Sequence, residues 1–207
     1  MTQRQAKLFV ISAPSGAGKT SLVKALVRDL PDVCFSVSYT TRPQRPGEVH
    51  GKDYFFVDRA GFERMIEDGA FLEYARVFDN YYGTARAQVE SLLATGCNVI
   101  LEIDWQGAQQ VRRAWPDCET VFILPPSREE LERRLRGRGT DADEVIARRL
   151  REAVEEMSHW QEFRHVIVND DFDDALAALK HVLRGENGQD PGHPALRPLV
   201  DSLLALS

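Results

Sequence analysis

The chain has 207 residues, of which 43% are hydrophobic, and carries a formal net charge of −6 at pH 7. This length fits one α/β domain with inserted subdomains and is sufficient to bury a full core. The acidic balance argues against a nucleic acid as the main partner, because proteins that bind polyanions usually carry a basic excess. The first five residues are polar, and no apolar run approaches the roughly 18 residues of a membrane span. We therefore expect a cytoplasmic protein that binds neither nucleic acid nor membrane.

A phosphate-binding loop is predicted near the start of the chain. The apolar run 8–11 is expected to form a strand, and the sequence Ser-Ala-Pro-Ser-Gly-Ala-Gly-Lys-Thr follows it directly at 12–20. Its glycines let successive backbone N–H groups turn toward an anion, and the helix expected after it adds the positive end of its dipole. Lys19 can reach the outer phosphates of a nucleoside triphosphate, while the Thr20 hydroxyl can coordinate Mg²⁺. The predicted triphosphate-binding residues of this loop are Ala13, Pro14, Ser15, Gly16, Ala17, Gly18, Lys19 and Thr20.

The loop departs from the G-x-x-x-x-G-K-[ST] pattern at one position, since Ala13 stands where the first glycine is expected. The alternative is an ordinary strand-to-helix turn. Such a turn would not need a lysine and a hydroxyl residue at these positions.

Four short apolar runs without alternation indicate strands that are covered on both faces. They lie at 8–11, 99–103, 121–124 and 166–168. Predicted helices follow them at 21–30, at 105–115, from Ser127 onward and at 173–183, and Ser127 with Glu130 has the spacing of a capping box. This alternation predicts an α/β fold with a parallel sheet, right-handed crossovers and helices on both sides.

Two stretches depart from the alternation. Between about 36 and 90 we expect a small insertion at the edge of the sheet, with short strands at 35–39, 54–57 and 71–77. The stretch 128–151 holds eight arginines, and Gly137 and Gly139 divide it into two charged helices. Glycines between two such helices suggest a hinged flap.

The tail is expected to start with a linker at 186–198, which is rich in Gly, Pro, Asn and Asp. The apolar residues after it could form a helix that docks on its own domain, or one that contacts a second copy of the chain in a homo-oligomer. Removing 186–207 and measuring the mass in solution would distinguish the two.

The three cysteines, Cys34, Cys97 and Cys118, are far apart in the sequence and lack metal-ligand spacing. We interpret them as reduced, mostly buried thiols.

Two arginines three residues apart, Arg42 and Arg45, lie beside a hydroxyl cluster on a segment stiffened by two prolines. Two guanidinium groups can converge on one phosphate, which arginine holds bidentately. Tyr54 and Tyr82 could each donate a phenolic hydrogen bond to the same anion. The alternative is a solvated basic turn.

Two carboxylates suit recognition of a base. Glu73 lies in a mostly apolar predicted strand, and Asp104 follows the apolar run 99–103 at the strand end where open α/β sheets bind ligands. An ionised carboxylate only accepts hydrogen bonds, so it matches the adjacent N1–H and 2-amino donors of guanine, which adenine lacks. Glu73 could instead be a solvent-facing strand residue, and Asp104 could serve Mg²⁺ through water.

Together these segments resemble the bacterial guanylate kinase family over about 7–184. No single segment is specific for this family, but the combination of segments is. The segments that carry the resemblance are 12–21, 38–48, 51–54, 82–84, 101–107, 134–140 and 167–171.

The resemblance implies the fold of a P-loop nucleoside monophosphate kinase, with a parallel sheet flanked by helices, an inserted GMP-binding subdomain and a helical lid. The implied kinase domain covers 7–185, with a tail at 186–207. Its implied parts are a core at 7–35, 91–126 and 160–185, a GMP-binding insertion at 36–90 and a lid at 127–159.

The implied activity is transfer of the γ-phosphoryl group of ATP to GMP, giving ADP and GDP, with dGMP as a second acceptor and Mg²⁺ as cofactor. The activity would serve purine nucleotide metabolism and GMP recycling. Glu102 stands where many relatives have Asp, so its part in the Mg²⁺ shell stays open.

By similarity, three groups of residues act on the substrates. Those that hold the GMP phosphate are Arg42, Arg45, Tyr54 and Tyr82. Those that read the guanine are Ser38, Glu73, Thr84 and Asp104. Those implied in catalysis are Lys19, Arg42, Arg134, Arg138 and Arg149, and Asn169 would lie near the adenine. The other arginines of 128–151 are expected to form a solvated face, paired with glutamates at helical spacing.

Two other functions remain open at this point. One is a guanylate-kinase-like binding module that has lost turnover, although the loop lysine and the substrate arginines are present here. The other is a P-loop kinase for a different phosphorylated acceptor, against which Glu73, Thr84 and Asp104 favour guanine.

Overall fold

The computed structural model describes residues 6–77, 79–137, 143–186 and 194–205. The chain forms two compact units, one of Met1–Val10 with Pro31–Cys118 and one of Ile11–Leu30 with Glu119–Ser207.

The strands form a five-stranded sheet in the order β2-β7-β1-β8-β9 and a four-stranded sheet in the order β4-β3-β6-β5. The strands of the larger sheet are β1 (Leu8–Ser12), β2 (Val33–Phe35), β7 (Asn98–Glu102), β8 (Glu119–Leu124) and β9 (His165–Val168). The pairs β2–β7 and β8–β9 are parallel. All four apolar runs predicted as strands form strands, although β7 ends one residue before the predicted end, and every residue of β1 is buried. The predicted α/β fold is therefore confirmed.

The smaller sheet lies within 39–85 and differs from the strands predicted there. Its strands are β3 (Tyr39–Thr40), β4 (Phe55–Phe56), β5 (Phe71–Val77) and β6 (Asn80–Ala85). The strand expected at 35–39 is wrong, because Val33–Phe35 pairs with β7 in the larger sheet and a new strand begins only at Tyr39. Strand β6 was not predicted. Its own sequence is polar and contains a glycine, and it is specified by pairing with β5 on one edge and β3 on the other.

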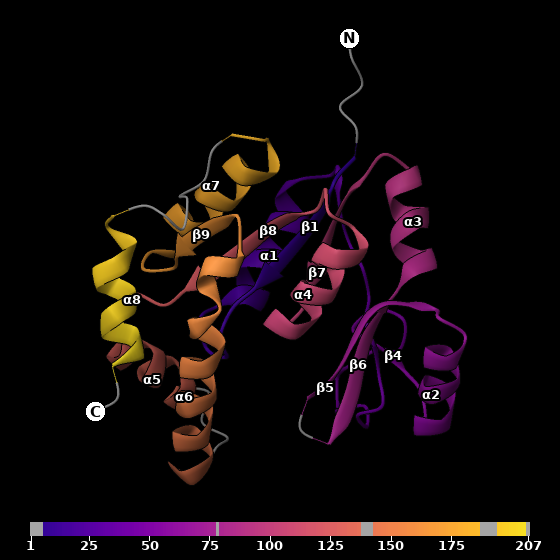
Figure 1. Ribbon diagram of the computed structural model, residues 1–207, viewed down its shortest axis with the longest axis horizontal. Helices are drawn as coiled ribbons and strands as arrows, with labels where there is room; N and C mark the ends of the chain where they lie inside the picture. The colour runs from indigo at the N-terminus through magenta and orange to yellow at the C-terminus, as the bar shows by residue number, and fades with distance from the viewer. Residues whose placement is uncertain (1–5, 78, 138–142, 187–193, 206–207) are drawn as a thin grey trace. The chain divides into compact units, whose positions relative to one another are not determined.

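The first unit also holds the helices α2 (Arg59–Glu67), α3 (Arg86–Ala94) and α4 (Trp105–Ala114). Helix α2, which was not predicted, begins at the N-cap Asp58, whose side chain accepts a hydrogen bond from the Gly61 amide. Phe62 on α2 stacks on Phe71 of β5 with ring centroids 4.4 Å apart. Burial of this aromatic ring fixes α2 beside the smaller sheet (Figure 1).

The second unit contains the remaining helices that the structure describes. They are α1 (Lys19–Asp29), α5 (Arg128–Arg136), α6 (Asp143–Ser158), α7 (Phe172–Leu183) and α8 (Leu196–Leu204), with a short 3₁₀ turn at Trp160–Glu162. The prediction of two helices within the arginine-rich stretch is confirmed. Ser127 caps α5 by accepting from the Glu130 amide, whereas the Glu130 carboxylate contacts arginines and does not complete the capping box. In the part of the chain that the structure describes, no helix is long and apolar enough to cross a membrane.

The tail helix α8 begins earlier than predicted. The linker expected to extend to Pro198 is wrong at its end, since α8 starts at Leu196. Pro198 is tolerated because the first N–H groups of a helix have no intrahelical partner to lose. Leu196, Val200 and Leu203 are buried, and α8 lies alongside α6 of the same unit (Figure 1).

The cysteines are only partly as predicted. All three are free, but burial applies to Cys118 alone, since Cys34 and Cys97 are partly exposed.

Candidate functional site

The loop between β1 and α1 has the backbone expected of an anion site. Gly16 and Gly18 have φ angles of 95° and 94°, a left-handed conformation that favours glycine. Gly18 is the N-cap of α1 and offers no side-chain hydrogen bond, and the first turn of α1 holds no acidic residue. The positive end of this helix therefore meets no carboxylate from its own first turn. Lys19 is half-buried and Thr20 is exposed at the start of α1, where a ligand can reach them.

Asn169 supports the loop directly. This side chain is 4% exposed, and its Nδ2 donates a hydrogen bond of 2.7 Å to the carbonyl of Ala17. A Cβ atom added at Gly18 would lie 2.4 Å from the same Nδ2. Two observations thus require glycine at position 18: the left-handed φ angle, and the Asn169 amide, which fills the space that a Cβ atom would need.

Arg134 on α5 reaches toward the same asparagine. Its Nε donates to Glu130 at 2.7 Å, and its Nη2 donates to the carbonyl of Asn169 at 3.0 Å. Its Nη1 is buried and has no hydrogen-bond partner among the described residues. An unpaired buried donor costs about 1–3 kcal/mol, so an anionic or carbonyl oxygen of a ligand would be bound favourably here.

The resemblance also implies Arg138 and Arg149 in catalysis. Arg149 is half-buried on α6. Arg138 lies outside the described residues.

The predicted solvated face is confirmed for three of its arginines. Their pairs are Arg133–Glu130, Arg136–Glu132 and Arg148–Glu152, each between exposed or half-exposed partners at helical spacing.

A contact that the sequence did not predict links α6 to the loop. The Ser15 amide donates a hydrogen bond of 3.1 Å to the Glu156 carboxylate. A negative group thus already lies on one loop N–H. The charged pattern of α6 contains Glu156 but does not distinguish it from its neighbours.

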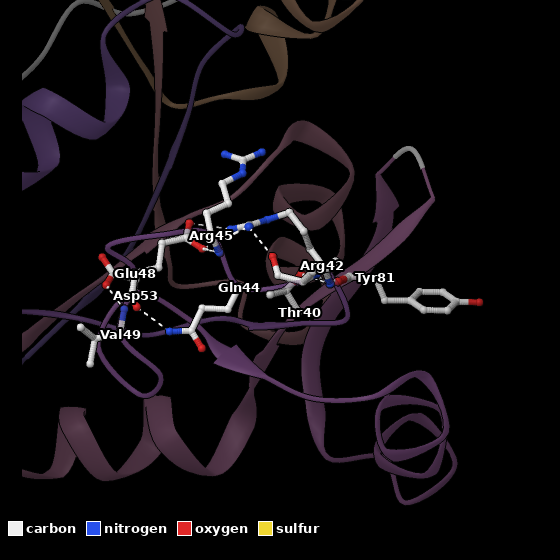
Figure 2. A network of polar contacts seen from close by, with 9 residues as sticks. Thr40, Arg42, Gln44, Arg45, Glu48, Val49, Asp53 and Tyr81 are labelled. Carbon is white, nitrogen blue, oxygen red and sulfur yellow. Dashed lines mark hydrogen bonds and ion pairs between the residues drawn. The ribbon is translucent and has the colours of Figure 1, made fainter. Parts of the chain in front are cut away.

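The arginine pair of the first unit lies in a network of polar contacts (Figure 2). The Arg42 side chain is 11% exposed, and its guanidinium forms an ion pair of 2.7 Å with Glu48, which also accepts from the Arg45 amide at 2.7 Å. Figure 2 shows the Arg45 guanidinium extending away from this ion pair. The two arginines are therefore close in the chain, but Glu48 binds the guanidinium of Arg42 and only the backbone amide of Arg45. The sequence motif included Glu48 without indicating its role.

Both predicted tyrosines lie beside Arg42. The guanidinium carbon is 5.4 Å from the centroid of the Tyr54 ring, and the rings of Tyr54 and Tyr82 meet edge to face at 6.0 Å. Burial raises the pKa of the Tyr54 phenol, so it is a neutral hydrogen-bond donor at physiological pH. The structure thus brings together Arg42, Tyr54 and Tyr82, as predicted for a phosphate site.

Glu73 and Thr84 form a buried polar pair across β5 and β6. Glu73 is 4% exposed, which excludes the alternative of a solvent-facing residue, and it accepts a hydrogen bond of 2.6 Å from the Thr84 hydroxyl. Burial raises the pKa of this carboxyl group from 4.5 to about 7. A Cβ added at Gly107 would lie 2.6 Å from Glu73 Oε2, so the glycine leaves the space that the carboxylate occupies.

Asp104 lies next to this pair and has a structural task of its own. Its side chain is the N-cap of α4 and accepts from the Gly107 amide at 2.8 Å. Its charge is close enough to Glu73 to contribute to the raised pKa of that group. Ser38 is half-buried just before β3, and its carbonyl accepts from the Phe55 amide.

Comparisons with known proteins agree on one family. The guanylate kinase family model matches residues 5–186. The chain is 64% identical over 180 residues to the guanylate kinase of Methylococcus capsulatus, covering 87% of this chain and 88% of that protein. It is 55% identical over 207 residues to the guanylate kinase of Escherichia coli strain K12, covering 97% and 99%. The crystal structure of guanylate kinase from Anaplasma phagocytophilum matches with a TM-score of 0.72 at 33% identity and covers 100% of both chains.

Proposed function

The chain belongs to the guanylate kinase family, and we propose that it transfers the γ-phosphoryl group of ATP to GMP, giving ADP and GDP. The assignment of GMP as the acceptor rests on the arrangement of side chains on and beside the smaller sheet of the first unit. Glu73 and Thr84 lie on its adjacent strands, and Tyr82 on the same strand as Thr84 contacts Tyr54 beside Arg42. The small sheet thus carries a buried acceptor suited to a base, and the segment that follows β3 carries a cationic group suited to a phosphate.

Recognition of guanine follows from the buried carboxylate. Glu73 can accept from N1–H and the 2-amino group of guanine through its two carboxylate oxygens, one of which also accepts from the Thr84 hydroxyl. Adenine would leave these acceptors unpaired, and a site built on such hydrogen bonds rejects the wrong partner by about 10⁴-fold or more. Ser38 and Asp104 are proposed as further contacts to the base.

The GMP phosphate is proposed to bind Arg42, Arg45, Tyr54 and Tyr82. Arg42 and the two phenols are in mutual contact, which supports their acting on one anion. The outward Arg45 guanidinium can turn to the phosphate without breaking an ion pair that the structure describes.

ATP is proposed to bind the loop 13–20 of the second unit. The left-handed glycines and the start of α1 suit its phosphates, and the buried Nη1 of Arg134 offers an unused donor. We propose Arg138 and Arg149 as further lid cations, and Asn169 beside the adenine. The hydroxyl oxygen of Thr20 is a hard donor that fits Mg²⁺, and the ion, when bound with ATP, would neutralise charge on the phosphates.

Transfer needs the acceptor oxygen in line with the γ-phosphorus and positive charge on its equatorial oxygens, with little covalent work by the protein. Lys19 and the lid arginines supply that charge. The acceptor is already an anionic phosphate oxygen, so no strong general base is required. Because water would hydrolyse ATP, it must be excluded when both substrates are bound.

The functional division into a core, an insertion at 36–90 and a lid at 127–159 is proposed on the same basis. A cytoplasmic location is proposed because both nucleotide substrates are cytoplasmic metabolites. For a homo-oligomer formed through the tail, less apolar surface is available, since Leu196, Val200 and Leu203 are already buried. The mass in solution of the chain without 186–207 still tests that hypothesis.

A coupled assay of ADP release tests the activity. GMP, dGMP, AMP, UMP, CMP and a sugar phosphate are offered in turn with ATP and Mg²⁺. We expect the fastest turnover with GMP, slower turnover with dGMP, and rates lower by about 10⁴-fold or more for the rest. Fastest turnover with any other acceptor would overturn the assignment, and no turnover with any of them would favour a binding module without catalysis.

A further inference from the structure

We propose that Glu48 positions Arg42 for binding of the substrate phosphate. The Glu48 carboxylate binds the two terminal nitrogens of the Arg42 guanidinium and so turns the Nε–H side of that group toward a phosphomonoester. This inference rests on the proposed function, and it assigns a role to a residue that the phosphate-binding set does not include.

The geometry of the contact is specific. Arg42 Nη2 donates to Glu48 Oε1 at 2.7 Å and Nη1 donates to Oε2 at 3.1 Å, so the carboxylate takes both ends of the guanidinium. Nη1 also donates to the Pro43 carbonyl at 2.7 Å. The contact between Arg42 and Glu48 is visible in Figure 2.

A count of donors shows which edge of Arg42 is left for a ligand. A guanidinium has five N–H groups in fixed directions, and the three bonds to Glu48 and Pro43 use both hydrogens of Nη1 and one of Nη2. The remaining two are Nε–H and the second Nη2 hydrogen, which point the same way along one side of the group. That pair can hold a phosphate bidentately. Besides Glu48, Tyr82 lies near enough to Arg42 to raise the pKa of the guanidinium slightly, so its phenol lies where it can share the anion.

Glu48 is itself held in place by its turn. Its amide donates to the Arg45 carbonyl at 3.2 Å, Gly47 has a φ angle of 86°, and its Oε2 accepts from the Arg45 amide at 2.7 Å. The side chain is 20% exposed, and its contact with Arg42 holds the pKa of the carboxyl group below its usual range. The anion is therefore charged and fixed before any substrate arrives.

Two opposing effects follow for a phosphate ligand. Glu48 restricts the guanidinium to one orientation, which lowers the entropy cost of binding. It also places a negative charge near an anion, which weakens binding. We infer that orientation is the larger effect, because Glu48 lies at the end of Arg42 and leaves the bidentate side unoccupied by carboxylate.

The experiment measures steady-state kinetics of the full chain and of Glu48→Gln, which keeps the size and removes the charge. We expect the KM for GMP to rise about tenfold, while kcat and the KM for ATP stay within about twofold, since the orientation acts equally in ground and transition states. Glu63→Gln is the matched control, because Glu63 pairs with Arg59 in the same unit on an exposed helix face. Its kinetics should match the parent.

Arg42→Lys provides the second arm, since a lysine has no fork to orient. In that background Glu48→Gln should change the KM for GMP much less than in the parent. If Glu48→Gln does not fold, as judged by thermal unfolding, Glu48→Asp replaces it, because it keeps the charge and shortens the side chain; the KM should then rise by a smaller factor.

The outcomes separate this inference from the proposed function. A parent that does not phosphorylate GMP overturns the proposed function. A parent that does, with a KM for GMP that is unchanged or lower in the Glu48 variant, overturns the positioning role. A lower KM would mean that Glu48 competes with the phosphate for Arg42. An equal change in both Arg42 backgrounds would mean that Glu48 acts through the turn alone, which also overturns it.

Discussion

Replacing Glu73 by glutamine should remove a pH dependence of stability that the buried carboxyl group imposes. Burial raises the pKa of Glu73 from 4.5 to about 7. Between these values the folded protein keeps a proton that the unfolded chain has lost, so the free energy of unfolding falls as the pH rises. The stabilisation is fully present below about pH 4.5, and it is lost once the pH exceeds about 7.

The size of the effect follows from the pKa and from the contacts of the side chain. A rise from 4.5 to about 7 corresponds to about 3 kcal/mol, at about 1.4 kcal/mol for each tenfold change in the protonation equilibrium. The substituted glutamine cannot ionise, and its oxygen can still accept from Thr84. Its amide nitrogen would lie in the tight space beside Gly107, where a poorly paired donor costs about 1 kcal/mol. We therefore expect Glu73→Gln to be about as stable as the parent at pH 5 and more stable than the parent by about 2 kcal/mol at pH 8.

Urea unfolding at pH 5 and pH 8 measures this difference. Glu63→Gln serves as the control, since this exposed carboxylate should give the same difference from the parent at both pH values. Other titrating groups are common to all three proteins and cancel in the comparison. If the Glu73 variant differs from the parent by the same amount at both pH values, the carboxyl group does not titrate with a raised pKa and the reasoning is refuted.

Three further substitutions test the ATP side of the proposal. Gly18→Ala should lower the melting temperature and raise the KM for ATP at least tenfold, because the added Cβ would meet the Asn169 amide and the φ angle is unfavourable; an unchanged KM would contradict this. Arg134→Met should lower kcat by about 10²-fold. It should cost little stability, because the loss of two Arg134 hydrogen bonds is offset by the removal of a buried N–H group that has no partner among the described residues. Arg133→Met is the control, since Arg133 is a highly exposed neighbour, and it should keep the parent rate. Arg138→Met should also lower kcat by about 10²-fold or more, and turnover within about twofold of the parent would exclude a catalytic role.

Predictability from the sequence depended on how local each feature is. The strand and loop at 8–20 were predicted because a contiguous apolar run and two glycines determine their own backbone. Strand β6 was not, since its residues 80–85 have no strong strand pattern and pair with partners on both sides only in the folded chain. The start of α8 was predicted too late because Pro198 resembles a helix breaker, although a proline is compatible with a first turn whose other residues are buried.

The candidate site shows the same distinction. The chemical types were evident from the sequence: a loop lysine, two neighbouring arginines and a carboxylate in an apolar strand. Their environments were not. Only the folded chain shows that Gly107 leaves room for the Glu73 carboxylate, that Asn169 fills the space beside Gly18, and that Glu48 takes the end of Arg42.

The sequence by itself therefore determined the fold class and the phosphate loop, because these follow from residues adjacent in the chain and from their periodicity. It also determined the family, through the resemblance that a combination of short segments carries. The tertiary structure decided which donors and acceptors are already paired. Glu73 and Thr84 are 11 residues apart, and Asn169 and Ala17 are 152 apart, yet each pair shares one buried hydrogen bond. Pairing and burial set the pKa of a carboxyl group and the free edge of a guanidinium, and both depend on contacts that only folding brings together.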